Sequence, residues 1–132
     1  MQRIELGDVL LIAEEHTGIS AQDLHRMDRV LMLVQAAIAA PFAGFGDVEV
    51  FETFEAKAAI YCARIVGYHP LPDANKRTGY DVMVEFVERN ERTWTHPPGG
   101  QDETESMIRR LAGEPPPLSE EQFCAWVASC IT

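Results

Sequence analysis

Residues 75–90 read NKRTGYDVMVEFVERN, and this stretch decides the fold that we expect. Its apolar side chains would cover most of the circumference of a helix, and a helix of that kind belongs in the centre of a bundle. They are Tyr80, Val82, Met83, Val84, Phe86 and Val87. The segment therefore predicts the central helix of an all-α domain.

Helical patterns flank this segment on both sides. On the amino-terminal side we predict a first helix over Leu6–His16, stopped by Gly18. A second helix begins at the capping signature of Ser20 and Asp23, and its apolar residues recur every three or four positions as far as Ile38. A third helix is expected from about residue 51 to Gly67, and two more over residues 102–112 and after Ser119, where Gln122 completes a capping box.

Residues 42–52 break the helical pattern. Val48 and Val50 alternate with polar residues, and Gly44 and Gly46 come just before them. Alternation beside glycines is typical of a small hairpin. The whole chain, residues 1–132, is thus expected to form a single domain: a compact helical bundle with one small β-hairpin.

Composition excludes several classes of function. The chain has 132 residues and a formal charge of −10, which disfavours binding to nucleic acid or to an anionic membrane surface. No stretch has the length of a membrane span or the pattern of a secretory signal. The three cysteines include no C-x-x-C pair, so we expect them to be reduced in a cytoplasmic protein.

One loop carries the chemistry. Residues 69–79 read HPLPDANKRTG, and either Asp73 or Asn75 would suit the cap of the helix that follows. Lys76 and Arg77 then fall in its first turn, where the helix dipole disfavours cations by about 0.3–1 kcal/mol each. An anion such as a polyphosphate, held by free N–H groups and both side chains, would explain them. The alternative is that both residues pair with surface carboxylates.

The same segment resembles the signature of the Fic/Doc superfamily, His-x-Phe-x-[Asp/Glu]-[Gly/Ala]-Asn-[Gly/Lys]-Arg. Its Ala-Asn-Lys-Arg version is similar to that of the Doc ("death on curing") toxins. The likeness extends over roughly residues 41–92 and includes the expected hairpin and the apolar helix. It implies the helical bundle of the Fic fold, with the hairpin as its flap. Leu71 departs from the family's usual Phe, which bears on how rigidly the loop is anchored.

The resemblance implies a role for each residue of the motif. His69 would be the general base that takes a proton from an attacking hydroxyl, and Asp73 would bind Mg²⁺. Arg77 would clamp a phosphate of ATP with its planar fork. The nucleotide's anion hole would be formed by Ala74, Asn75 and Lys76, through backbone N–H groups and the Asn75 amide.

Two residues favour one group transfer over another. Fic enzymes that transfer AMP have Gly where this chain has Lys76, and commonly a second Arg where it has Tyr80. In Doc-like members the Lys variant accompanies a reversed nucleotide, from which the γ-phosphate is transferred. The resemblance therefore implies a protein Ser/Thr kinase, with AMP transfer as the alternative.

The expected hairpin has a family role as well. In Fic-fold enzymes an extended target segment pairs with the flap and presents its hydroxyl to the histidine. Here the candidate docking strand comprises Asp47, Val48, Glu49, Val50 and Phe51. The alternative is that its apolar side chains only fill the core.

The biological setting is also implied by the resemblance. The chain would be the toxin of a toxin–antitoxin pair, restrained by a Phd-type antitoxin, because it lacks the [Ser/Thr]-x-x-x-Glu helix with which some Fic proteins inhibit themselves. Its expected target is elongation factor Tu, and the outcome is arrested translation. A third reading, from another class, is a catalytically idle binding module.

Overall fold

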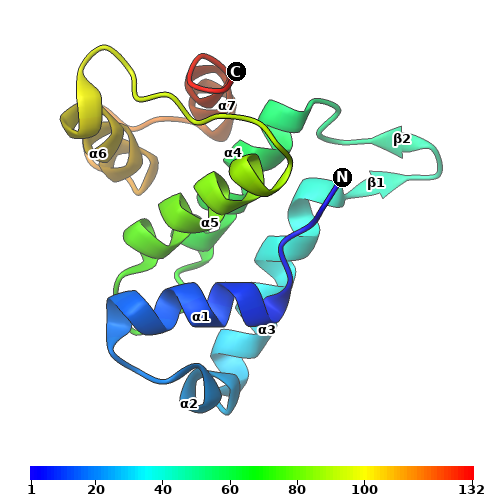
Figure 1. Ribbon diagram of the computed structural model, residues 1–132, viewed down its shortest axis with the longest axis vertical. Helices are drawn as coiled ribbons and strands as arrows, with labels where there is room; N and C mark the ends of the chain where they lie inside the picture. Colours follow the sequence, from blue (N-terminus) through cyan, green and yellow to red (C-terminus); the bar gives the residue numbers. More distant parts are fainter.

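The computed structural model describes all 132 residues and is all-α with one small hairpin, as the sequence predicts (Figure 1). The elements are α1 (Leu6–Thr17), α2 (Ala21–His25), α3 (Asp28–Ala39), a 3₁₀ turn (Ala40–Phe42), β1 (Gly44–Phe45), β2 (Val48–Glu49), α4 (Phe54–Tyr68), α5 (Asn75–Arg89), α6 (Gly100–Leu111) and α7 (Glu120–Ala128). None of the helices combines the length and the apolar character that crossing a bilayer demands.

The centre of the bundle is the pair formed by α4 and α5, which run side by side in opposite directions (Figure 1). The predicted centre, α5, buries seven residues, whereas α4 buries nine and is the more enclosed of the two. α4 packs against α3, α5 and α7. Three of its buried residues are Ala58, Ala59 and Ala63, whose small side chains let neighbouring helices approach from several sides.

Several helix boundaries differ from prediction by one to three residues, and two further differences bear on the core and on the loop. The helix expected from Ser20 to Ile38 is interrupted at Met27, whose extended backbone caps α3 instead of continuing α2. The interruption lets Val30 and Val34 face the core while Met27 is exposed. α4 continues past Gly67 and ends at Tyr68, because the next residue, His69, adopts the left-handed conformation that terminates the helix.

The hairpin lies at the amino-terminal end of α4. β1 and β2 pair antiparallel, with Gly44 opposite Glu49 and Phe45 opposite Val48. At its base the buried Lys57 of α4 donates to the Phe51 carbonyl and, at 3.2 Å, to the Glu49 carboxylate. The strands beyond this anchor are exposed.

The remaining helices close the other faces of the pair. α1 lies along α5 in the opposite direction: Asp8 near the start of α1 binds Arg89 at the end of α5 at 2.9 Å, and His16 near the end of α1 binds Asp81 at 2.6 Å. α6 and α7 cover the opposite side, and an isolated antiparallel bridge of Trp94 with Ile131 ties the last residues to the segment after α5. Cys62, Cys124 and Cys130 are all free thiols, as predicted.

Candidate functional site

The loop between α4 and α5 is held in an uncommon backbone conformation at both of its ends. His69 has φ of 51° and Ala74 has φ of 61°, and only one other non-glycine residue of the chain has a positive φ. Side chains disfavour this left-handed region, and such residues cluster at functional sites, where the surrounding structure holds them. The loop that sequence singled out is therefore also the place where backbone strain concentrates.

The buried Asn75 side chain holds the loop through two hydrogen bonds. Its Oδ1 accepts the Leu71 N–H at 2.9 Å, and its Nδ2 donates to the Leu71 carbonyl at 3.0 Å. Asn75 is 5 % exposed and Leu71 is 1 % exposed, so both bonds are shielded from water. The Asn75 amide was predicted to contribute to the anion hole; its oxygen and one of its two N–H donors bind the loop, and its part in anion binding stays a prediction. The leucine, despite being smaller than the family's Phe, is fully buried as the loop's anchor.

A residue of α3 also forms hydrogen bonds that hold the loop. Arg29 donates through Nη1 to the carbonyls of His69, at 2.8 Å, and Pro70, at 3.3 Å. No local sequence pattern points to this residue, because it is an exposed arginine 40 positions away from the loop. Arg29 fixes the backbone on which the His69 side chain stands, and that side chain is exposed.

The first turn of α5 has no side-chain cap. Ala74 occupies the cap position, so neither Asp73 nor Asn75 caps the helix as the sequence suggested. The N–H groups of Asn75, Lys76 and Arg77 have no acceptor within the protein. Because these groups and the helix dipole point the same way, the end of α5 offers a ready site for an anion.

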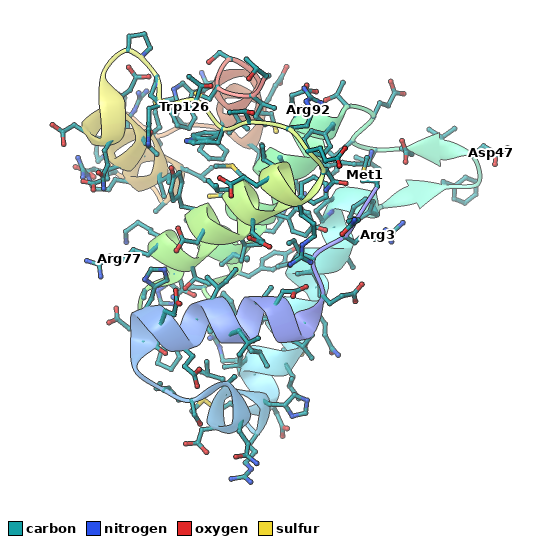
Figure 2. The ribbon with its side chains drawn as sticks, viewed as in Figure 1. Met1, Arg3, Asp47, Arg77, Arg92 and Trp126 are labelled. Atoms are coloured by element: carbon teal, nitrogen blue, oxygen red, sulfur yellow. The ribbon has the colours of Figure 1, made fainter.

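Lys76 and Arg77 are the unpaired cations of the molecule. Each of the other nine of its 11 Lys and Arg side chains has a hydrogen bond, an ion pair or an aromatic ring as its partner. Lys76 and Arg77 have none and are both exposed, and Arg77 projects away from the start of α5 (Figure 2). The alternative that surface carboxylates neutralise this pair is therefore wrong.

Asp73 presents a free carboxylate on the loop. Its carboxylate is exposed and makes no hydrogen bond or ion pair. No cluster of three or more His, Cys, Asp or Glu side chains is placed to bind a metal by itself. A single free carboxylate nevertheless suits Mg²⁺, which is commonly held by one or two carboxylates, substrate phosphates and water.

A cavity of about 530 Å³ opens beside the first two turns of α5. It lies between α5 and α6, with His16 of α1 on its wall, and both Lys76 and Arg77 line it. His69 and Asp73 do not line it, so only part of the predicted site borders the cavity. No sequence signal indicated this cavity, since its walls come from α1, α5, α6 and the loop before α6.

The structure does not bring the proposed docking strand to the loop. The hairpin joins the amino-terminal end of α4, and His69 stands at the other end of this 15-residue helix, a span of about 22 Å. Asp47 at the hairpin tip and Arg77 lie on opposite sides of the molecule (Figure 2). Phe45, Val48 and Val50 are exposed rather than core-filling, whereas Phe51 is partly buried.

The geometry of the loop and of the helix end can be set against known proteins. No family model, curated protein or solved structure matches this chain. The functional assignment therefore depends on the residues of the loop and on their surroundings.

Proposed function

We propose that the protein is a Doc-like protein kinase, a member of the Fic/Doc superfamily that transfers the γ-phosphate of ATP to a serine or threonine hydroxyl. One observation supports this proposal above the others. The only two Lys or Arg side chains without a partner stand in the first turn of an uncapped helix, next to three N–H groups without acceptors. A polyphosphate supplies the negative charge and the hydrogen-bond acceptors that this arrangement lacks.

Each residue of the loop has a task in this reaction. The hydroxyl oxygen attacks the γ-phosphorus, the bond from that phosphorus to the β,γ-bridging oxygen breaks, and ADP leaves. His69 accepts the hydroxyl proton, and its exposed position allows a protein substrate to reach it. Lys76, Arg77 and the free N–H groups bind the phosphates. Mg²⁺, with Asp73 as its protein ligand, would neutralise charge on them.

Transfer can be tested with two labels. Purified protein is incubated with elongation factor Tu, Mg²⁺ and either [γ-³²P]ATP or [α-³²P]ATP. The proposal expects the γ label alone on the target, together with a mass increase of one phosphate. Transfer of the α label instead would show that the enzyme is an AMP transferase.

A matched pair of variants separates catalysis from folding. His69→Ala should abolish labelling and leave the melting temperature nearly unchanged, because the exposed side chain makes no hydrogen bond or ion pair. His25→Ala removes another exposed histidine, far from the loop in sequence, and should keep full activity. Equal labelling by wild type and His69→Ala would remove the general base from the proposal, and no labelling in any protein would favour an idle binding module.

The setting as a toxin rests on the resemblance. Expression of the wild-type chain should halt translation and growth, and His69→Ala should not. We propose a Phd-type antitoxin as the partner that relieves this arrest, and co-expression with such an antitoxin would measure it. Growth arrest by the His69→Ala variant would indicate harm of another origin.

A further inference from the structure

The hairpin has an apolar face that no other part of the protein covers. Phe45 and Val48 lie opposite each other and therefore point to the same face, and Val50, two residues further along, points the same way. Phe45 is 91 % exposed, and both valines are exposed as well. Large apolar side chains that gather on one exposed surface are typical of an interaction site.

The hairpin is also held in position and projects from the bundle (Figure 1). The buried Lys57 binds Glu49, whose side chain points to the face opposite that of Val48. Asp47 stands at the hairpin tip (Figure 2), and its carboxylate makes no hydrogen bond or ion pair. The projecting end therefore combines an apolar face with an unpaired anion.

An open groove of complementary chemistry lies between α1 and α2. Its volume is about 420 Å³. Leu10, Leu11 and Ala21 supply its apolar wall, and Leu11 is 59 % exposed. The other lining residues are Gly7, Gln22, His25 and Arg26, so the lining contains no carboxylate.

The acidic residues of the two helices stay outside this groove. They are Asp8, Glu14, Glu15 and Asp23. Asp23 contacts Arg26 at 3.6 Å, and an arginine has five N–H donors, so the guanidinium keeps donors free for a second carboxylate. In a chain of charge −10, a lining of this kind lets an anionic tip approach without repulsion from the groove itself.

We infer that the hairpin of one copy of this protein binds in the α1–α2 groove of a second copy. Phe45 and Val48 pack against Leu11, and the Asp47 carboxylate meets Arg26. The occupant comes from another copy because the hairpin projects from one side of the bundle and α2 lies at its far end (Figure 1). The two surfaces differ, so the contact is heterologous, and it builds an open chain or a closed ring.

Sedimentation equilibrium measures this association. The wild type should exceed its monomer mass of 14.7 kDa as its concentration rises toward about 1 mM, where even weak contacts form. Phe45→Ser removes the ring from the hairpin, and Leu11→Glu places a carboxylate in the groove, where it repels Asp47. Each variant should weaken association by roughly tenfold or more. Met32→Glu is the matched control, because Met32 is a 62 % exposed apolar residue of α3 outside both surfaces, and this variant should associate like wild type.

An equal mixture of the two defective variants distinguishes this contact from a symmetric one. Leu11→Glu keeps an intact hairpin and Phe45→Ser keeps an intact groove, so the mixture should form a dimer of one copy of each and nothing larger. A mixture that stays monomeric indicates contact between like surfaces and overturns the inference. If Leu11→Glu melts at a much lower temperature than wild type, Arg26→Glu replaces it, because it reverses the charge that faces Asp47.

Three other results would also overturn the inference. One is a wild type that stays monomeric at every concentration. Another is an association that Phe45→Ser or the groove variant leaves unchanged. The third is an association that Met32→Glu weakens as much as Leu11→Glu does. The contact involves neither the α4–α5 loop nor the first turn of α5, so none of these results bears on phosphate transfer.

Discussion

Arg77→Glu should make the protein more stable while destroying its activity. Arg77 is the third residue of α5 and has no partner, so it stands uncompensated at the positive end of the helix dipole. Removing an unfavourable cation and adding a favourable anion are each worth about 0.3–1 kcal/mol, a sum of about 0.6–2 kcal/mol. A glutamate there can also accept a hydrogen bond from the Ala74 N–H, which has no acceptor.

The expected gain is measurable by thermal unfolding. A domain of this size has an unfolding entropy for which 1 kcal/mol corresponds to about 4 °C, so the melting temperature should rise by about 2–8 °C in low salt. In 1 M NaCl, where the screening length falls to about 3 Å, much of the gain should disappear. Circular dichroism at 222 nm follows the transition, and labelling with [γ-³²P]ATP follows the activity.

The same substitution should change the melting temperature in the opposite direction when it is made at the carboxyl end of a helix. Arg109 lies in the last turn of α6 and pairs with Glu114 at 2.9 Å, so Arg109→Glu should lower the melting temperature. Arg and Glu have similar helix propensities, which leaves position as the difference between the two variants. If Arg77→Glu is no more stable than wild type in low salt, Arg77 has a stabilising partner and the reasoning on the uncompensated cation fails.

Three further changes test the loop and its surroundings. Ala74→Gly should raise the free energy of unfolding by about 1 kcal/mol in urea titrations, because glycine adopts the left-handed conformation without penalty; a lower midpoint would contradict the observed φ of 61°. Asn75→Ala leaves the buried N–H and carbonyl of Leu71 without partners and should cost about 2–4 kcal/mol; a loss below 1 kcal/mol would show that the loop is held by other contacts. The hydrogen bond from Arg89 holds the pKa of Asp8 below its usual 3.8. The stability that this pair contributes is therefore present above pH 3.8 and is lost as the pH falls through the lower pKa of the folded state. The Asp8→Asn variant should therefore be less stable than wild type at neutral pH, and its free energy of unfolding should fall less steeply as the pH is lowered. An unchanged pH dependence at acid pH would show that the Asp8–Arg89 pair does not contribute.

Local chemistry explains which parts of the fold the sequence predicted. The caps at Ser20 and at Ser119 with Gln122 form as expected, because they involve residues only three positions apart. The hairpin and the first-turn position of Lys76 and Arg77 follow from equally local patterns. The break at Met27 was missed, because its apolar spacing continued across it and only tertiary packing turned Val30 toward the core.

The candidate site was predictable in its residues but not in its assembly. The motif identified His69 and Asp73 as neighbours on one loop, since four positions separate them. It could not show that the Asn75 side chain would bond to Leu71, because an asparagine at a helix start has several possible partners. The cavity and the contact of Arg29 join segments from distant parts of the chain, and no pattern within one segment reports them.

The hydrogen bonds that Asn75 and Arg29 make to the loop have a thermodynamic consequence for any ligand. Asn75 and Arg29 hold the backbone in its left-handed turns before anything binds, so the free protein has already lost the conformational freedom of this segment. Association then leaves little disorder to remove, and its entropy is governed by released water and counterions. The loop is preorganised for binding, so its selectivity among ligands follows from a rigid shape.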